Sequence, residues 1–297
     1  MSRKVFKWVS DLIKTKPDQT TTRAWSMIGS SVIELYHCGH RQNDKLIFTA
    51  QDKFQLRSKL KSEFGIDPFF TTQLPDDRLD IARHHDNEKL ARLPPSHGHI
   101  LINSPNGILQ LNKQQIQLQS EHILSAGLMC LSSGINQIDH ESIVVVENLP
   151  IMQLCSAFTL PPLCQNALWI YRGDYKSGAK MNACYDLLKR FGNDKNIIVF
   201  SDMDPKGLEI ALTIPHANYW LGPETAAWTD CLKSRHASHS GFDIQTSAMK
   251  YLMKISDTAC LSKPINDLIL QLRTEHSSYR QEHMYVHNIA LSLFPIT

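Results

Sequence analysis

The fold is decided by two runs, Ile143-Val144-Val145-Val146-Glu147-Asn148 and Ile197-Ile198-Val199-Phe200-Ser201-Asp202-Met203-Asp204. Each run is built of β-branched or aromatic residues and ends in acidic side chains. Continuous apolar runs of this length are typical of strands buried on both faces, as in a parallel sheet covered by helices. Open α/β sheets bind ligands at the carboxyl ends of such strands. We therefore expect Glu147, Asp202 and Asp204 to meet at one edge of a sheet.

The acids of the second run have the spacing of metal ligands. Asp202 and Asp204 are two residues apart, so in an extended chain their side chains lean to the same side. Pro205 suits the first position of a helix, with Asp204 as its N-cap. Three converging carboxylates repel one another unless a cation lies between them, and carboxylate oxygens favour Mg2+ or Mn2+. The sequence therefore predicts a divalent-metal site at Glu147, Asp202 and Asp204.

Strands and helices alternate around these two runs. We expect strands at 143–147, 167–171, 196–201 and about 217–221, with helices at about 149–157, 177–190 and 205–213 between them. This alternation predicts a parallel sheet with right-handed crossovers and helices on both faces. After Pro223 the pattern indicates helices near 224–234, 245–258, 263–273 and 278–291. Residues 142–297 are thus expected to form one α/β domain with a helical C-terminal extension.

The chain before residue 142 is expected to form two further parts. Residues 1–95 predict helices at 3–15 and from the Thr20–22 cap through Leu35, a strand at 45–48, and a helix opened by the Thr49-Ala50-Gln51-Asp52 capping box. We interpret this order as a winged-helix-like module, followed by a polar helix over 74–93. Residues 96–141 predict a hairpin of 100–102 with 108–111 around Asn106-Gly107, and a connector over 112–141 that fits either strand or helix.

Composition narrows the class of protein. The 297 residues are 42% hydrophobic and 20% charged, as in folded soluble proteins. No stretch approaches the length of a membrane span, and the start, Met1-Ser2-Arg3-Lys4, is too polar for a secretory signal. Seven cysteines without a Cys-x-x-Cys pair favour reduced thiols. We therefore expect a cytoplasmic protein without membrane contact. Residues 1–70 hold 12 Lys and Arg against 7 Asp and Glu, which permits contact with phosphate.

A strand ending in Glu147 and a later strand ending in Asp202-Met203-Asp204 resembles the Toprim domain of topoisomerases, bacterial primases and related nucleases. The phrases Val-Val-Glu-Asn-Leu, Ile-Tyr-Arg-Gly-Asp and Ser-Asp-Met-Asp-Pro-Lys-Gly-Leu-Glu-Ile-Ala are most similar to the Toprim subunit of SMC-type plasmid-defence systems (Wadjet JetD, also called MksG). That subfamily is itself similar to the A subunit of topoisomerase VI. The resemblance covers residues 142–221. It implies that the two aspartates hold divalent metal and that Glu147 is a metal ligand or a general acid.

The same resemblance implies a function. It points to a metal-dependent DNA endonuclease that hydrolyses phosphodiester bonds with Mg2+ or Mn2+. It also implies an SMC-like ATPase complex with kleisin-type subunits as partner, double-stranded and circular plasmid DNA as substrate, and a homodimer that cuts both strands. Residue chemistry alone establishes none of these three.

Further charged residues are candidates for the same site. Phosphate contacts are expected from Arg172, Lys176 and Lys180, which follow the second strand, and from Lys206 beside the Asp-x-Asp pair. Their charges are equally expected in solvated loops. Asp174 is a possible additional metal ligand. Glu282, in Tyr279-Arg280-Gln281-Glu282, faintly resembles a Leu-Glu-Gln-Glu element of the JetD-type domain, although only Gln281 and Glu282 match; the alternative is a surface acid on a helix.

Two rival functions and one rival metal site follow from other residues. A topoisomerase VI A-like transesterase would cut with a tyrosine, and Tyr36 is the N-terminal candidate, although its apolar surroundings favour a core position. A non-catalytic DNA-binding regulator on the same fold is the second rival; three clustered carboxylates argue against it, because they are costly without a cation. His37, Cys38 and His40 suggest zinc but lack the second pair of ligands that closed zinc sites have.

Overall fold

The computed structural model describes residues 2–118, 126–174, 176–258 and 260–297. The chain divides into two compact units, Met1–Pro95 and Ser96–Thr297, and each is described by itself. The connector expected over 112–141 lies partly outside the described residues, because 119–125 are not among them. None of the described helices is both long and apolar enough to span a bilayer.

The N-terminal unit combines helices with a small antiparallel sheet. Its elements are α1 (Arg3–Lys14), β1 (Thr21–Ala24), α2 (Met27–Tyr36), β2 (His40–Gln42), β3 (Lys45–Phe48), α3 (Ala50–Phe64), α4 (Arg78–Ala82) and the 3-10 turn η1 (Glu88–Leu90). The strand order is β1-β3-β2. The predicted capping box at Thr49 and Asp52 is confirmed. The prediction that Thr20–22 cap the second helix is wrong: this segment forms β1 against β3, and Ser26 caps α2.

Several basic residues of this unit have structural partners. Lys53 is buried, and its ammonium donates to the carbonyl oxygens of Thr15 and Lys16 just after α1. The Arg57 guanidinium pairs with Asp67 at 2.7 Å. The positive excess counted in the sequence therefore overstates the charge that this unit presents to a partner.

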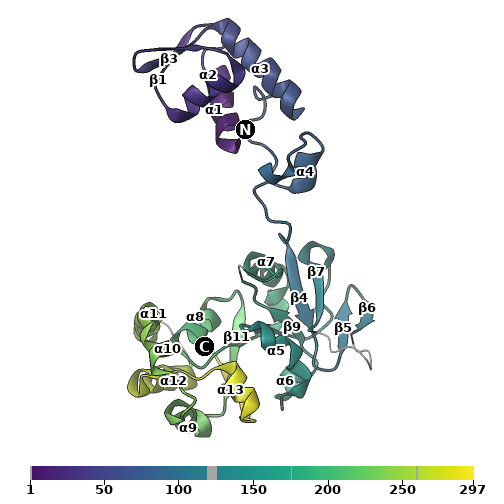
Figure 1. Ribbon diagram of the computed structural model, residues 1–297. Coiled ribbons are helices and arrows are strands. Elements are labelled where there is room, and N and C mark those ends of the chain that lie inside the picture. The colour runs from purple at the N-terminus through teal and green to yellow at the C-terminus, as the bar shows by residue number, and fades with distance from the viewer. Residues whose placement is uncertain (1, 119–125, 175, 259) are drawn as a thin grey trace. The chain divides into compact units, whose positions relative to one another are not determined.

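In the residues that the structure describes, the C-terminal unit is built on a seven-stranded sheet with helices on both faces (Figure 1). Its strands are β4 (His99–Asn103), β7 (Leu128–Leu131), β8 (Ser142–Val146), β9 (Leu168–Tyr171), β10 (Asn196–Phe200), β11 (Ala217–Pro223) and β12 (Leu291–Pro295). They lie in the order β12-β11-β10-β8-β9-β4-β7. The four central strands are parallel, and β12, β4 and β7 add antiparallel pairs. The predicted α/β class is confirmed, with a mixed rather than wholly parallel sheet.

The strand order reverses between β8 and β10. From β8 the chain passes through α5 (Leu149–Gln153), η3 (Cys155–Ala157) and α6 (Pro162–Gln165) to β9 on one side. It then returns through α7 (Met181–Phe191) and η4 (Gly192–Asp194) to β10 on the other side of β8, and continues through α8 (Pro205–Thr213) to β11. Right-handed crossovers in opposite directions place these helices on opposite faces. The carboxyl ends of β8 and β10 therefore form the topological switch point of the sheet, where ligands bind in such folds.

The region after β11 is mostly helical and ends in a strand. It contains η5 (Thr225–Ala227), α9 (Trp228–Lys233), α10 (His239–Asp243), α11 (Thr246–Thr258), α12 (Lys263–Glu275) and α13 (Gln281–Val286). The predicted helix over 278–291 is too long, since α13 has six residues and the chain then enters β12. Strand β12 pairs antiparallel with β11, and its Leu291 and Phe294 are buried.

Two predictions before residue 112 are wrong. Strand β4 does not pair with β5 (Ile108–Leu111): β4 lies between β7 and β9, and β5 pairs with β6 (Gln114–Gln117). The hairpin turn is at Asn112-Lys113, both with positive φ, whereas Asn106-Gly107 turns the chain out of the large sheet. The helix expected over 74–93 is reduced to the five residues of α4 and the turn η1, because this polar stretch has no continuous apolar face.

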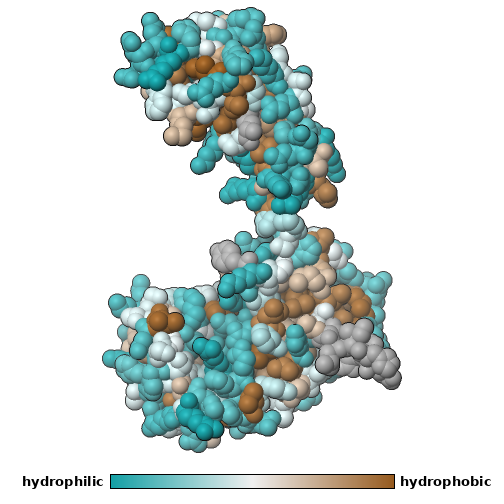
Figure 2. Space-filling view, in the orientation of Figure 1, coloured by the Kyte–Doolittle hydropathy of each residue, from teal (hydrophilic) through white to brown (hydrophobic). Residues whose placement is uncertain are grey.

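Apolar side chains are exposed over the part of this unit that contains β4 to β7 (Figure 2). On strand β7, Met129 is 43% and Leu131 is 49% exposed. Strand β7 is at an edge of the sheet, where unpaired backbone groups are a template for association. Strand β7 is separated in the sheet from the switch point between β8 and β10 by strands β4 and β9.

Candidate metal centre

Glu147 and Asp202 meet at the switch point. Val146 and Phe200 are paired in the parallel register of β8 and β10, so the residues that follow them leave the sheet side by side. The Glu147 backbone N–H donates to the Phe200 carbonyl oxygen at 3.0 Å. In return, the Asp202 backbone N–H donates to Glu147 Oε2 at 3.2 Å. The structure thus brings together the two acids that the sequence placed at the ends of separate strands.

Asp204 is held by the helix that it caps. It is 6% exposed, and its Oδ1 accepts from the Gly207 backbone N–H at 2.6 Å at the start of α8. Its Oδ2 accepts from Gln245 Nε2 at 2.7 Å. Gly207 must be glycine, because a Cβ there would lie 2.1 Å from the Asp202 carbonyl oxygen. The predicted N-cap and the first-turn Pro205 are confirmed.

A segment remote in sequence, residues 277–282, completes the site. Met203, between the two aspartates, forms a two-way backbone bridge with Tyr279. The Gln281 backbone N–H then donates to Asp202 Oδ1 at 2.8 Å. Asn148 Nδ2 donates to the same Asp202 oxygen at 3.0 Å and contacts Glu282 Oε2 at 3.5 Å. The 277–282 segment therefore places Glu282 beside Asp202, which favours the site interpretation of Glu282 over that of a surface acid.

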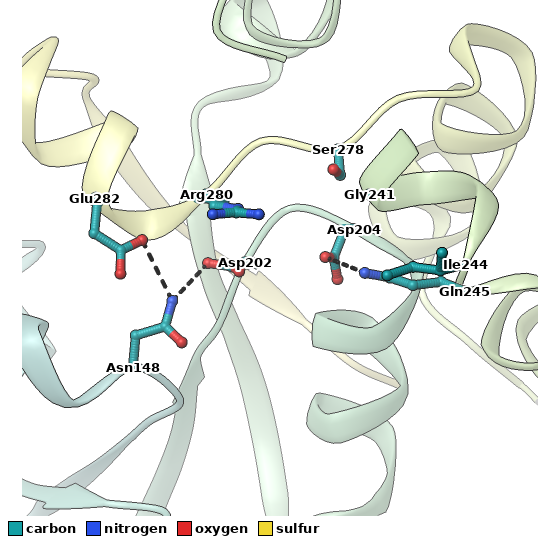
Figure 3. Close-up of a pocket in the computed structure, with 9 residues that line it drawn as sticks. All are labelled: Asn148, Asp202, Asp204, Gly241, Ile244, Gln245, Ser278, Arg280 and Glu282. Atoms are coloured by element: carbon teal, nitrogen blue, oxygen red, sulfur yellow. Dashed lines mark hydrogen bonds between the residues drawn. The ribbon is translucent and has the colours of Figure 1, made fainter. Parts of the chain in front are cut away.

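These side chains surround a cavity of about 250 Å³ (Figure 3). Its lining includes Asn148, Asp202, Asp204, Gln245, Arg280 and Glu282. Figure 3 shows Glu282 and Asn148 on one side, Asp204 with Gln245 on the other, and the Arg280 guanidinium near Asp202 between them. The cavity is polar, and acids from two separate parts of the chain line it: Asp202 and Asp204 after β10, and Glu282 in the 277–282 segment.

The electrostatics of this group are unfavourable without a counterion. Burial, followed by the charges of Glu147 and the other acids, raises the pKa of Asp202 to about 8, although hydrogen bonding from Gln281 acts in the opposite direction. Burial and the charge of Asp204 likewise raise the pKa of Glu147. A cation bound here would favour the ionised form of both carboxylates and would displace the proton that Asp202 retains near neutral pH.

The chemistry of the donor set fits a hard divalent cation. Glu147, Asp202, Asp204 and Glu282 supply carboxylate oxygens, and neither thiol nor imidazole belongs to the group. Within the described ranges, however, no three His, Cys, Asp or Glu side chains are already arranged as a metal site. One reason is visible at Asp204, whose two oxygens already accept from Gly207 and Gln245. Binding of a cation would require the carboxylates to use their remaining lone pairs or Gln245 to withdraw.

The other predicted residues lie in different surroundings. Asp174 caps its own loop: Oδ1 accepts from the Lys176 and Ser177 backbone N–H groups and Oδ2 from the Tyr171 hydroxyl. Lys180 Nζ donates to the Ser177 carbonyl oxygen. These contacts hold the described residues of this loop together, and Asp174 is not among the residues that line the cavity.

Arg172 and Lys206 are nearer to the carboxylates. The charges of both act on Glu147 and lower its pKa, against the larger effect of burial. Arg172 Nε is buried without an acceptor among the described residues. The Lys206 ammonium pairs with Glu209 at 2.7 Å. Arg172 therefore retains free donor capacity at the sheet edge, and Lys206 must exchange a partner to contact phosphate.

Tyr36 and the suspected zinc ligands lie in the N-terminal unit. Tyr36 is 9% exposed and its hydroxyl donates to Glu63 Oε2 at 2.7 Å. Burial and this bond raise the Tyr36 pKa well above its ordinary value. Cys38 is buried, and its thiol contacts the Tyr36 carbonyl oxygen at 3.3 Å. Tyr36 and Cys38 are therefore core residues, whereas His37 and His40 are exposed.

Sequence reasoning missed four residues of the site: Asn148, Gln245, Arg280 and Gln281. Asn148 could have been found, because it directly follows Glu147 and shares its edge of the sheet. The other three are 41 to 79 residues from the aspartates they contact or face. The backbone bridge between Met203 and Tyr279 brings the segment of Arg280 and Gln281 to the site, and Gln245 reaches it from between α10 and α11.

Comparison with models of protein families gives a match over the C-terminal unit. The family model described as a domain of unknown function, DUF7281, matches residues 97–293, well over half of the chain. The matched range contains the whole of the cavity lining and nearly all of the C-terminal unit. No curated protein matches the chain.

Proposed function

We propose that this chain, which belongs to the DUF7281 family, is a divalent-metal-dependent DNA endonuclease of the Toprim type. The observation that carries the proposal is the convergence of Glu147, from the end of β8, with Asp202 and Asp204, from the end of β10, at the switch point of the sheet. Glu282 joins them from the 277–282 segment. Three acids around one polar cavity, with Glu147 hydrogen-bonded to the Asp202 backbone beside them, are the arrangement that a cation and a phosphate ester require together.

In this proposal Mg2+ or Mn2+ is held by Asp202 and Asp204, with Glu147 or Glu282 as further ligands. When bound, the metal supplies positive charge that neutralises phosphate oxygens and makes water more acidic. Hydrolysis adds a water oxygen to phosphorus, breaks the bond from phosphorus to the sugar oxygen, and delivers a proton to that leaving oxygen. Glu147 is suited to hold this proton, because burial raises its pKa.

The chain's own residues keep the reacting groups in place. Asp204 is fixed by its N-cap bond, and Asp202 by donors from Asn148 and Gln281. Rigid support of this kind reduces the reorganisation needed at the transition state. Arg172 lies close enough to influence Glu147 and offers an unpaired buried Nε to a phosphate oxygen.

The N-terminal unit serves in this proposal as a winged-helix-like docking module for DNA or a partner. The Arg41 guanidinium lies 5.5 Å over the ring of Trp25, which is 46% exposed. Arg23 lies over Trp8 at 5.1 Å. Arginine next to exposed aromatic rings can bind phosphate while the ring contacts sugar or base.

Resemblance to the JetD-type subunits extends the proposal to biology. It supports an effector nuclease of an SMC-like complex with kleisin-type subunits that cuts circular plasmid DNA as a homodimer. These partners are separate from the metal chemistry. If the protein cleaves DNA without such partners, the proposed metal site and its chemistry still hold.

We favour hydrolysis over transesterification by tyrosine. The Tyr36 hydroxyl donates to Glu63, and deprotonation would place a phenolate beside a carboxylate. Tyr36→Phe should therefore leave DNA cleavage unchanged and cost about 1 kcal/mol of stability through the lost hydrogen bond. Denaturing gels after cleavage should show no covalent protein–DNA adduct.

The proposal is tested by a plasmid-nicking assay with Mg2+ or Mn2+. Asp202→Ala should abolish nicking and retain DNA binding. Asp194→Ala is the matched control, because Asp194 is exposed at the amino end of the same strand, β10, far from the carboxyl edge. If Asp202→Ala nicks the plasmid as fast as the wild type does, this site is not the source of cleavage.

A further inference from the structure

We propose that Arg280 is the residue that binds the non-bridging oxygens of the phosphodiester in the cavity of Asp202 and Asp204, opposite the cation. This inference rests on the proposed function and deepens it by naming the group that recognises phosphate. Arg280 was not a candidate in the sequence. Its position follows from three features of the fold.

First, the backbone on both sides of Arg280 is fixed to the metal ligands. Tyr279 exchanges two backbone hydrogen bonds with Met203, at 2.9 and 3.0 Å. Gln281 donates its backbone N–H to Asp202 at 2.8 Å. Arg280 is thus held between two residues that contact the Asp202–Asp204 turn. Its side chain can reorient, but its Cα cannot leave the mouth of the cavity without breaking these bonds.

Second, the guanidinium has no ion pair in the described part of the chain, although it lines a cavity with three carboxylates. Figure 3 shows it near Asp202, between Glu282 and Ser278. An arginine in acidic surroundings ordinarily forms a bidentate pair with a carboxylate. Here the acids already accept from Asn148, Gln281 and Gln245. The guanidinium fork therefore stays available, and its geometry matches two phosphate oxygens.

Third, a second donor without an acceptor lies on the same segment. Gln281 is wholly buried, its Oε1 accepts from the Asn148 backbone N–H, and its Nε2 has no partner among the described residues. Buried donors are rarely left unpaired without a reason. Gln281 does not line the cavity, so Arg280 is the residue of this segment that gives the acidic cavity a donor for an anion, which the carboxylates alone would repel. A phosphate would then be bound by the cation on one side and by Arg280 on the other.

The test uses the full-length protein and small probes that do not need the N-terminal unit. Hydrolysis of bis(p-nitrophenyl) phosphate with Mn2+ should fall about 100-fold in kcat/KM for Arg280→Ala, as for loss of one transition-state donor. Arg280→Lys should recover part of the rate, since lysine keeps charge but not the fork. Arg273→Ala, at an exposed arginine of α12, is the matched control and should behave as the wild type.

Two further readouts separate this inference from the proposed function. The Mn2+-induced rise in Tm should be unchanged in Arg280→Ala, and titration with thymidine 5′-monophosphate in Mn2+ should show about tenfold weaker binding. Rates and affinities of Arg280→Ala within threefold of the wild type would overturn the role of Arg280 while leaving the nuclease intact. If the wild type neither hydrolyses the ester nor responds to Mn2+, the proposed function fails. The nucleotide titration then still decides whether Arg280 binds phosphate.

Discussion

Two loops at the carboxyl edge of the same sheet each place an aspartate shortly after a parallel strand, and the two aspartates differ physically. Asp174, after β9, is exposed, and its donors come from its own loop: Lys176, Ser177 and Tyr171. Asp202, after β10, is partly buried among other acids, and its donors come from Asn148 and Gln281.

The pKa values express the same contrast. Backbone N–H bonds, from Ser177 above all, lower the pKa of Asp174 to about 2, whereas burial raises that of Asp202 to about 8. An acid whose hydrogen-bond donors all belong to its own loop stabilises the conformation of that loop. An acid surrounded by other acids and held by remote segments is organised for a ligand. We therefore propose that the loop after β10 is the reactive one, and the predictions below test this difference.

The largest contrast should appear in catalysis. Asp204→Asn keeps the N-cap, because asparagine caps helices as well as aspartate does. It removes the charge, and we expect cleavage to fall by about 1,000-fold, the upper range for one electrostatic contributor. Asp174→Asn should remain within about threefold, since it lies outside the cavity. Rates of Mn2+-dependent plasmid cleavage measure both, and equal losses in the two variants would remove the distinction.

The next comparison is between two glycine-to-alanine substitutions, one in each loop. A methyl group at Gly207 would lie 2.1 Å from the Asp202 carbonyl oxygen, so Gly207→Ala must displace the turn. We expect a loss of about 2 kcal/mol in unfolding free energy, as for other overpacked sites, together with loss of cleavage. Gly178→Ala, in the loop after β9, meets only Met129 Cε at 3.4 Å and should change stability little. Urea unfolding compares the two. Similar stability of both variants would show that the Asp202 turn is not tightly packed.

The pH dependence of stability should reveal Asp202 in metal-free protein. Between pH 4 and 8 the folded state holds a proton on Asp202 that the unfolded state has lost, because the folded pKa is about 8. The folded state then binds more protons, so unfolding free energy falls as pH rises through this window. Asp202→Asn removes this decline and should be the more stable form at alkaline pH. Thermal unfolding in EDTA from pH 5 to 9 checks it; parallel curves for both proteins would contradict the raised pKa.

The smallest effect is expected at Asp174, with the opposite sign. Its folded pKa of about 2 lies below its ordinary value of 3.8, so its contribution is present above pH 4 and is lost as pH falls toward 2. Because the side chain is exposed, the effect should be slight. Asp174→Asn should be marginally less stable than the wild type at pH 6, and this difference should largely disappear at pH 2. A large difference at pH 6 would mean that Asp174 has partners beyond its loop.

Sequence patterns predict the central strands of the C-terminal unit correctly. They predict the remaining strands and their pairing less well. Strands such as Ile143–Val146 are recognised because residues buried on both faces form continuous apolar runs. The same logic placed Glu147 and Asp202 at one edge. It did not reveal strand β12 or the pairing of β4, because pairing between strands distant in sequence leaves no local signature.

The site shows the same limit. Glu147, Asp202 and Asp204 were found because each terminates an element with a recognisable pattern. Arg280 and Gln281 lie in an irregular segment whose position depends on a bridge between Met203 and Tyr279, 76 residues apart. Asp174 was ranked as a possible ligand because its position after a strand is the same as that of Asp202. What separates them is the origin of their hydrogen-bond donors, which only a three-dimensional structure provides.

The most direct measurement is anomalous X-ray scattering from crystals of the protein grown with Mn2+. We predict a manganese peak in the cavity, coordinated by Asp202 and at least one of Glu147, Asp204 and Glu282, and absent from Asp202→Asn crystals. Crystals of active protein that show no peak there, or that show the Arg280 guanidinium paired with these carboxylates in its place, would contradict the metal centre and the nuclease proposed from it.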